Sequence, residues 1–457
     1  MIDNQVLENL KDSSSDDMVN IQIEESLVRE TLMAIDSANF SEDLLTLVCF
    51  GFVLILVLLT GYLGPQDVTI NPTPVEFTGT SAIFERKLIF SDFSSLNNHI
   101  LITLSLTPKN RSASDFLKTQ FSYTVHCHNK QDLVRAENEK MQEYKVKYVE
   151  GDTQTAKIHL FNHTVITYDT LELTLMFDHA SEVFSSFTIY FQTGSSDHTY
   201  FQIYFRIVFT TITFAFLVLL LFSLRKLEVK LWHLEQKMTV PLLLMLILYN
   251  NPLQVLHFYS PSIVLAIFDR LVYALYHAYL YFFILVLFDS LRYKNRKTDT
   301  CFFIPKVILC ITLFILYAAH GIYDELHMYD EETGRDPTET SLSFAQLVCF
   351  LVFCAYSILS IVVSGVKVDV TERYKFNIYF SSGLITVIIM TIAQILFSMK
   401  FMYGSSLSFV LKFASENIFA LLMAYFHWPY EVLQDQQYDG AQENQDAPEE
   451  FFVNENA

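Results

Sequence analysis

The sequence predicts a membrane α-helical protein, in which a signal-anchor helix and a seven-helix bundle are separated by a luminal or extracellular antiparallel β-sandwich. Two observations carry this prediction. Apolar residues make up 52% of the 457 positions and fall in blocks, which is unusual for a soluble chain of this length. Between the first two blocks, apolar and polar residues alternate with the period of two that is typical of strands.

Eight apolar blocks are long enough for a helix to cross a bilayer, which takes about 20 residues. They span residues 44–63, 201–224, 239–260, 262–288, 302–321, 342–366, 377–400 and 407–427. The first is expected to act as an uncleaved signal anchor, because 43 polar and acidic residues precede it. The other seven form the bundle, which occupies residues 201–427.

Most of the net charge of −20 lies in two tails, residues 1–43 with −9 and residues 428–457 with −8. Polar, acidic segments are typical of disordered chain, so we expect both tails to be disordered, with trafficking adaptors as candidate partners. The second tail contains Tyr430-Glu-Val-Leu433, which fits a tyrosine-based sorting pattern or, alternatively, forms an interfacial cap beside Trp428. No basic patch indicates nucleic-acid binding.

The charges of the short loops predict the orientation of the chain. Lys and Arg gather in loops 225–238, 289–301 and 367–376, whereas loop 322–341 is acidic with one arginine. Cytosolic loops are enriched in basic residues. Both termini are therefore expected in the cytosol, and residues 64–200 in the lumen or outside the cell.

The region 64–200 is predicted to be the β-sandwich. Segments such as 99–106, 171–177 and 186–191 alternate apolar and polar residues, and six to eight short strands of this kind suggest two packed antiparallel sheets. The charged stretch 130–147 interrupts the alternation, and we expect a loop or a short surface helix there.

The chemistry expected in this region is modest. Asn110 and Asn162 each begin an N-glycosylation sequon on the predicted luminal side. His126 and His128 flank Cys127, but ordinary surface histidines are favoured over a metal site because no acidic partner lies nearby. The six cysteines show no metal-binding or redox spacing, and neither a metal nor another cofactor is expected.

Polar residues inside the predicted spans are the candidates for function, because such groups are costly in a bilayer. With a rise of about 1.5 Å per residue, Arg270 and Glu416 lie about 12–14 Å below the luminal starts of their helices, so we expect them to pair. Pro252 interrupts another span in the same half. The candidate ligand-binding residues are Arg206, Asn250, Asn251, Asp269, Arg270, Gln394, Glu416 and Asn417.

Two interpretations of this polar set remain open. It either lines a luminally open cavity that accepts a polar or amphiphilic ligand, or locks the helices together through buried hydrogen bonds. A channel is less favoured, because only His277 and Asp289 continue the polar groups toward the cytosol. No HExxH, paired aspartates or Ser/His dyad is present, so we predict no catalytic residues and no enzyme.

Several short stretches carry a resemblance to a known family. They are Phe201–Arg206, Leu224–Lys226, Glu235–Lys237, Leu248–Pro252, Ile304–Lys306, Asp324–His327 and Lys375-Phe376. With the order of anchor, β-sandwich and seven helices, they resemble the Wntless-like group and the transmembrane protein 181 family, over about residues 200–430.

The resemblance implies a non-enzymatic, receptor-like protein of the Golgi and endosomal secretory pathway or the plasma membrane. Wntless itself escorts lipid-modified proteins, but its luminal domain is braced by cysteines that this chain lacks. We therefore predict a receptor or cargo-trafficking protein whose partners are membrane lipids and a lipid or a secreted, lipidated protein. The alternatives are a surface receptor that signals through loops 225–238 and 289–301, and, less favoured, a channel or transporter.

Overall fold

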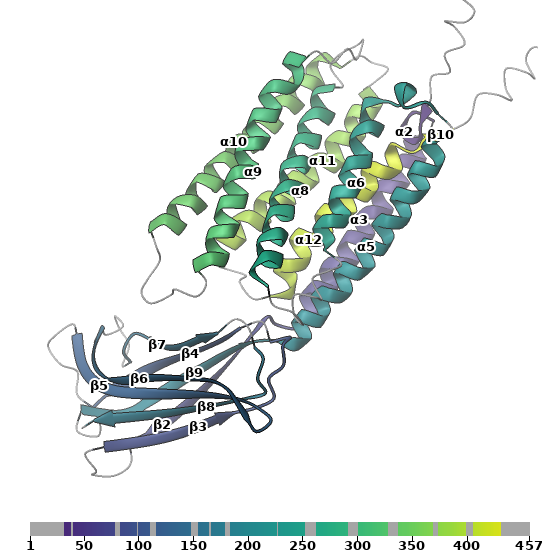
Figure 1. Ribbon diagram of the computed structural model, residues 1–457. Coiled ribbons are helices and arrows are strands. Elements are labelled where there is room, and N and C mark those ends of the chain that lie inside the picture. Colours follow the sequence, from purple (N-terminus) through teal and green to yellow (C-terminus); the bar gives the residue numbers. More distant parts are fainter. Residues whose placement is uncertain are drawn as a thin grey trace, which may run out of the picture.

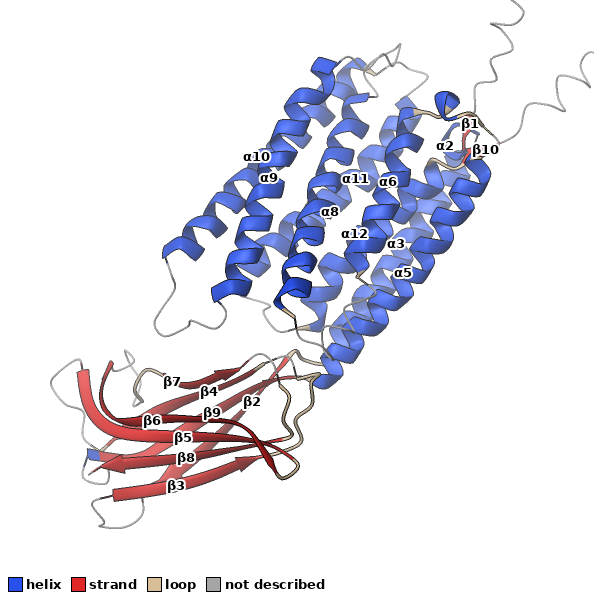
Figure 2. Cartoon of the chain, viewed as in Figure 1, coloured by secondary structure: helices blue, strands red, loops and turns tan. Residues whose placement is uncertain are grey.

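In the computed structural model, the chain folds into a helical bundle with a β-domain at one end (Figure 1). The long helices form the bundle and the long strands form the β-domain, while one pair of two-residue strands lies at the far end of the bundle, as Figure 2 shows. The structure describes residues 32–37, 40–77, 83–97, 99–109, 116–147, 154–163, 166–178, 183–225, 227–251, 262–290, 300–327, 337–368, 373–398 and 405–430.

Seven helices in the described part of the chain are long and apolar enough to cross a membrane. They are α3 (Phe40–Leu63), α5 (Ser196–Leu224), α8 (Ile263–Ser290), α9 (Thr300–His327), α10 (Pro337–Lys367), α11 (Arg373–Ser398) and α12 (Ser406–Phe426). Each coincides with a predicted span, which confirms the membrane helical architecture.

The remaining predicted span, 239–260, overlaps helix α6, and residues 252–260 lie outside the described part. Helix α6 covers Leu234–Asn250 and has 17 residues. It ends there because Pro252 has no backbone N–H to donate and disfavours helical geometry in the residue before it. Asn251 adopts a left-handed φ of 44° and its N–H bonds to Leu248 O, a geometry that asparagine tolerates at a helix C-terminus.

The β-domain consists of two four-stranded antiparallel sheets, which confirms the predicted sandwich. One sheet has the order β2-β9-β4-β7 and the other β3-β8-β5-β6. The strands are β2 (Val68–Glu76), β3 (Ile83–Phe90), β4 (Ile100–Pro108), β5 (Phe116–Asn129), β6 (Asp132–Lys147), β7 (Ile158–His163), β8 (Thr170–Asp178) and β9 (Phe184–Gly194).

The alternation in β8 shows why these segments become strands. Leu171, Leu173, Leu175 and Phe177 are fully buried, whereas the residues between them are not. Successive side chains of a strand point to opposite faces, so the apolar set enters the space between the sheets. Members of both sheets, including Ile102, Leu104, Phe121, Phe187 and Ile189, complete this core.

The expectation of a loop or helix at 130–147 is wrong. Those residues form β6, which pairs with β5 from Asn129↔Asp132 to Phe116↔Lys147 at the edge of the sheet. Its side chains are mostly exposed on both faces, so no apolar alternation marks it. Strand pairing requires only backbone groups, and charged side chains are a common protection for an edge strand.

The end of the first acidic tail is also structured. Leu32–Met33 form strand β1, which pairs with β10 (Pro429–Tyr430), and Ala34–Ser37 form helix α2. Met33 and Ile35 are buried against the bundle. Leu32–Ser37 and the start of α3 at Phe40 are therefore structured, contrary to the predicted disorder over residues 1–43, whereas residues 1–31 lie outside the described part. Residues 431–433 of the predicted sorting pattern lie outside the described part.

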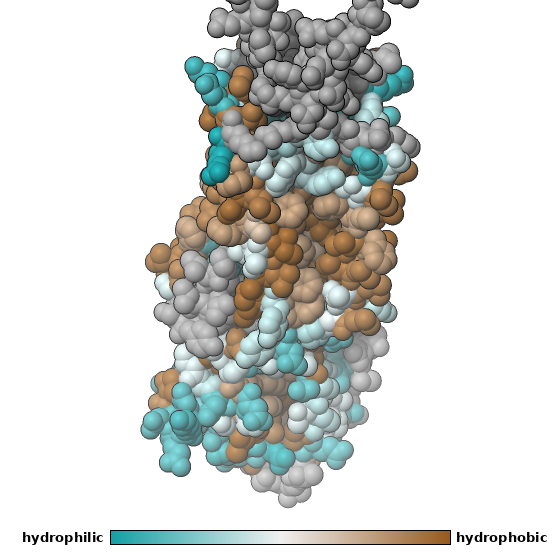
Figure 3. Space-filling view, turned by 90° about the vertical axis from the view of Figure 1, so that its right-hand side faces the viewer, coloured by the Kyte–Doolittle hydropathy of each residue, from teal (hydrophilic) through white to brown (hydrophobic). Residues whose placement is uncertain are grey.

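Both ends of the described chain lie at the end of the bundle opposite the β-domain (Figure 1). Figure 3 shows a belt of hydrophobic residues around the bundle on the face in view, between hydrophilic residues toward either end. Exposed apolar side chains such as Phe52 of α3 and Phe214 of α5 belong to the membrane-spanning helices. Such an exposed apolar surface is what a lipid environment covers.

Two glycines allow α3 to approach α12 closely beside the β-domain. A Cβ atom on Gly61 would lie 2.8 Å from Cβ of Val410, and one on Gly64 would lie 2.7 Å from Cβ of Ser406. At Gly51, by contrast, a Cβ atom would meet nothing within 4 Å. Small residues let membrane helices pack at short distance, so these glycines set the contact between the anchor helix and the last helix.

Candidate functional site

A buried pair of ionisable residues lies in the middle of the bundle. Nε2 of His277 on α8 is 3.0 Å from Oε1 of Glu416 on α12, and both residues are fully buried. Nδ1 of His277 is 2.8 Å from the backbone oxygen of Tyr273. A carbonyl oxygen only accepts, so Nδ1 carries a proton.

This geometry determines how many protons the pair holds. Because Nδ1 is protonated, the short Nε2–Oε1 contact needs a second proton, on the imidazole or on the carboxyl. The pair is therefore either an imidazolium with a carboxylate or a neutral imidazole with a carboxylic acid. Both forms carry no net charge, which reduces the large cost of burying ionised groups.

Tyrosines surround this pair. The ring centroids of five lie 4.2–6.1 Å from that of His277, and they are Tyr249, Tyr273, Tyr276, Tyr281 and Tyr317. They come from α6, α8 and α9. We call His277, Glu416 and these tyrosines the His277 centre.

Several polar atoms in and beside the His277 centre have no hydrogen-bond partner among the described residues. They are Oε2 of Glu416, the hydroxyl of Tyr276 and Oδ1 of Asn250. The great majority of buried polar groups in proteins are hydrogen-bonded, and an exception calls for an explanation such as a water, an ion or a ligand. The centre therefore has unused hydrogen-bonding capacity.

The predicted pair of Arg270 and Glu416 does not form. Arg270 instead donates from Nε and Nη2 to Oε1 of Glu325 on α9, at 2.9 and 2.7 Å. The depth estimate was wrong because α8 and α12 are staggered. Lys412 on α12 contacts Tyr273 on α8, and Glu416 on α12 contacts His277 on α8. In both contacts the residue number on α12 exceeds the residue number on α8 by 139. Arg270 thus lies seven residues, or about 10 Å, closer to the β-domain than Glu416 does.

Arg206 caps the end of α6. Its Nη1 donates to the backbone oxygens of Tyr249 and Asn250, at 3.3 and 3.4 Å. These carbonyls have no intrahelical partner because the helix stops at Asn250. A cation at a helix C-terminus is also favoured by the helix dipole. Arg206 therefore has a structural role that accounts for its charge.

Further predicted residues tie the same helix end to its neighbours. Nδ2 of Asn250 donates to Oδ1 of Asn417 on α12 at 2.8 Å, and Nδ2 of Asn251 donates to Oδ1 of Asp269 on α8 at 2.7 Å. The structure thus uses most of the predicted residues as links between helices. The side chain of Gln394 lies outside the described part.

Lys412, which lies beside the His277 centre, was not among the candidate residues predicted from the sequence. Lys412 of α12 lies one turn from Glu416, contacts the Tyr273 hydroxyl and stands 4.6 Å from the centroid of that ring. The signal was available, because Lys412 lies inside the predicted span 407–427.

A second buried polar group lies toward the opposite end of the bundle, where the sequence suggested few. Nζ of Lys306 on α9 is 2.6 Å from Oδ2 of Asp289 on α8, and both side chains are nearly inaccessible. Nearby, His427 bonds with Thr239 at 2.6 Å and with the Tyr379 hydroxyl at 3.0 Å. Buried polar groups therefore occupy both halves of the bundle.

The β-domain offers less chemistry. Cys127 is buried, and burial raises the pKa of its thiol to about 11, which makes it unreactive at neutral pH. Within the described residues, no group of three or more His, Cys, Asp and Glu side chains is placed to hold a metal. Asn162 is exposed on the edge strand β7, whereas Asn110 lies outside the described residues.

Comparisons with known proteins agree with this architecture. A family model described as "Wntless-like, transmembrane domain" matches residues 195–431, from the start of α5 to just after β10. Transmembrane protein 181 of Homo sapiens is 24% identical over 302 residues, which cover 63% of this chain and 61% of the relative. The match thus spans about three fifths of that relative's length. Because the family model covers more than half of the chain, the protein is a multi-pass membrane protein that belongs to the Wntless-like family.

Proposed function

We propose that this protein is a non-enzymatic receptor or cargo-trafficking protein of the secretory pathway or plasma membrane. It binds a protein or lipid ligand through the β-domain and through the His277 centre. One observation carries this proposal: in a buried centre lined by aromatic rings, Oε2 of Glu416 and the hydroxyl of Tyr276 have no hydrogen-bond partner among the described residues.

The energetics support a ligand at this position. An unsatisfied buried polar group costs about 1–3 kcal/mol. A ligand group that donates a hydrogen bond to Glu416 Oε2 removes that cost, and the Tyr276 hydroxyl is able to donate or accept. The surrounding tyrosine rings offer apolar faces for the body of the ligand. An amphiphile with a hydroxyl, amide or ammonium group fits this combination.

The proposal includes an orientation, in which the β-domain faces the lumen or the cell exterior and both ends of the chain face the cytosol. The basic loops at the end of the bundle opposite the β-domain support it. Protease treatment of sealed microsomes tests it, with the β-domain expected to be protected and the ends digested. An N-glycan lost on Asn162→Gln is the second expected result.

The ligand is tested by purifying the full chain in mild detergent and identifying bound lipids and proteins by mass spectrometry. Two matched variants of α8 are compared. Tyr276 has an unpartnered hydroxyl, whereas the hydroxyl of Tyr279 donates to the backbone oxygen of Met238 at 2.9 Å. Tyr276→Phe is expected to reduce recovery of the bound molecule without loss of thermal stability. Tyr279→Phe is expected to lose about 1 kcal/mol of stability and to keep the molecule.

Two outcomes contradict the proposed ligand site. Equal recovery of the bound molecule from Tyr276→Phe and the wild type would remove the His277 centre from the binding site. Purification without any bound lipid or protein, from membranes in which the protein functions, would remove the carrier role.

A further inference from the structure

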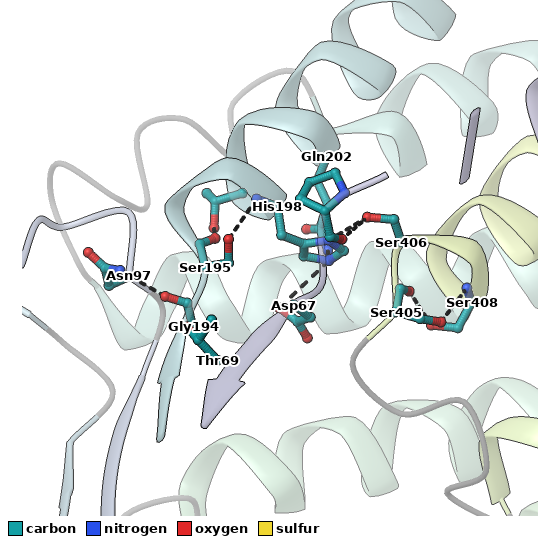
Figure 4. A network of polar contacts seen from close by, with 12 residues as sticks. Asp67, Thr69, Asn97, Gly194, Ser195, His198, Gln202, Ser405, Ser406 and Ser408 are labelled. Atoms are coloured by element: carbon teal, nitrogen blue, oxygen red, sulfur yellow. Dashed lines mark hydrogen bonds and ion pairs between the residues drawn. The ribbon is translucent and has the colours of Figure 1, made fainter. Parts of the chain in front are cut away.

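The β-domain meets the bundle at a compact polar joint (Figure 4). We define the joint as Pro65, Asp67, His198, Gln202 and Ser406. They come from the linker between α3 and β2, from the first two turns of α5 and from the start of α12. His198 is 2% exposed and lies at the middle, with a polar neighbour on each side.

The hydrogen bonds of the joint determine the protons on His198. The Ser406 hydroxyl donates to the backbone oxygen of Pro65, so its oxygen accepts from Nδ1 of His198 at 2.8 Å. Nε2 of His198 is 2.8 Å from Nε2 of Gln202, an amide nitrogen that only donates. The ring is therefore neutral in this arrangement, with a proton on Nδ1 and a lone pair on Nε2.

In this geometry an added proton binds to Nε2 of His198. Nε2 would become a donor facing the amide nitrogen of Gln202, so that contact has to break or the amide has to turn. The carboxylate of Asp67 already lies 3.6 Å from Nε2, just beyond hydrogen-bond distance. The protonated ring thus exchanges a neutral hydrogen bond on its own helix for an ion pair with the linker that begins the β-domain.

We propose that His198 is a proton-operated latch, in which acidification ties Asp67 to α5 and tightens the β-domain onto the bundle. Histidine is the side chain whose charge ordinarily changes between pH 5 and 8. The latch works independently of the His277 centre, and it stands whether or not that centre binds a ligand.

Hydrogen bonds around the joint connect the start of α5 to the β-domain. The Ser195 N–H donates to the backbone oxygen of Asp67 at 2.7 Å, and the Thr199 hydroxyl donates to Leu96 O at 2.8 Å. Nδ2 of Asn97 donates to Gly194 O at 2.8 Å. The first turn of α5 is thus bonded directly to the linker and to the chain segment that precedes β4.

Among the described residues, other charged or titratable groups around the joint include those of His99, Asp197, Tyr62 and Lys412. His99, which precedes β4, is near enough to Asp67 to feel its charge, although burial is the larger effect and lowers the pKa of His99. Asp197 on α5 and Tyr62 on α3 are exposed. On α12, Lys412 lies six residues beyond Ser406, about 9 Å deeper in the bundle.

The latch is tested by backbone hydrogen exchange of the full chain in lipid nanodiscs at pH 7.5 and 5.5, corrected for the intrinsic rate at each pH. The Ser195 amide is expected to gain about tenfold protection at pH 5.5, as a hydrogen bond between charged groups would give. The Phe77 amide, which donates to Ser185 O within the β-domain, serves as the internal reference and should not change.

Three variants decide which group carries the response. His198→Gln and Asp67→Asn are expected to abolish the gain, whereas His99→Gln is expected to keep it. No gain in the wild type would overturn the proposal, and so would an undiminished gain in either of the first two variants. Because the wild-type comparison needs no substitution, the test remains valid even if a variant fails to fold.

Discussion

Two buried ionic pairs occupy the same bundle, and they differ in how completely they are satisfied. In the pair of Lys306 and Asp289, the ammonium also donates to Phe302 O at 2.8 Å, and Oδ1 of the carboxylate accepts from the Ser360 hydroxyl at 3.3 Å. In the pair of His277 and Glu416, Oε2 of the carboxylate has no partner among the described residues.

The difference separates a structural site from a candidate functional one. A buried ion pair offsets its desolvation only when additional hydrogen bonds satisfy both groups, and the first pair meets that condition. It joins α8, α9 and α10, and needs no further molecule. The second pair is incomplete among the described residues and lies among aromatic rings in the middle of the bundle. Polar residues in a membrane span are functional candidates by default, and the incomplete pair keeps that status.

The largest expected effect comes from breaking the complete pair. Asp289→Asn leaves the ammonium of Lys306 buried without its counter-charge, so we expect a loss of about 3–5 kcal/mol in the free energy of unfolding. Thermal unfolding in detergent measures it. The double variant Asp289→Leu with Lys306→Met should recover most of the loss. A loss below about 1 kcal/mol in the single variant would show that the pair is not a structural lock.

A histidine in the β-domain tests what burial does to an imidazole outside the membrane-spanning helices. Burial, together with the charge of Arg135, lowers the pKa of His163 to about 4, and the ring contacts the Tyr168 hydroxyl at 3.2 Å. The unfolded chain binds the proton from about pH 6.5 downward. The folded domain should therefore lose stability as the pH falls from about 6.5 to 4, by at most about 3 kcal/mol.

His163→Gln is the matched variant for this pH dependence. Because glutamine does not titrate, the stability of the variant β-domain should fall less between pH 6.5 and 4 than that of the wild type. Denaturant unfolding at several pH values measures the difference. If the free energy of unfolding depended on pH in the same way in both proteins, His163 would not be the responsible group.

A smaller effect is expected from the incomplete pair. Glu416→Gln keeps the shape of the side chain, and His277 can release its proton to stay neutral, so no charge is left buried. We expect a loss of about 1 kcal/mol, well below that of Asp289→Asn. A loss as large as that of Asp289→Asn would contradict the distinction between the two pairs.

The smallest effect is expected from the pair of Arg270 and Glu325, at the end of the bundle nearest the β-domain. The side chain of Arg270 is 43% exposed where it pairs with Glu325. Solvent screens such pairs, which contribute about 0–1 kcal/mol. Arg270→Ala should therefore cost less than about 1 kcal/mol, and it should leave the contact between His277 and Glu416 intact. Retained ligand together with a stability loss of several kcal/mol would show that Arg270 has a role that its exposure does not suggest.

Much of the fold followed from one-dimensional patterns. A helix needs a certain apolar length to cross a bilayer, and a strand of the sandwich needs a period of two, so the spans and strands such as β8 were predictable. Patterns failed where side chains do not decide the structure. β6 is charged on both faces and exists through backbone pairing with β5.

The site was predictable only as a set of residues. Polar side chains inside apolar spans pointed to Arg206, Asn250, Asn251, Asp269, Glu416 and Asn417, and the structure brings them to neighbouring levels of the bundle. Their partners were not predictable. The expected pairing of Arg270 with Glu416 failed because it assumed that two helices begin at the same depth.

The amino-acid sequence by itself thus determined which segments enter the membrane, which form the sandwich and which polar residues are buried. Only the tertiary structure decided which charges meet. The reason is the stagger of α8 against α12, which places His277 rather than Arg270 beside Glu416. Such a stagger results from packing between whole helices, and no local pattern of residues records it.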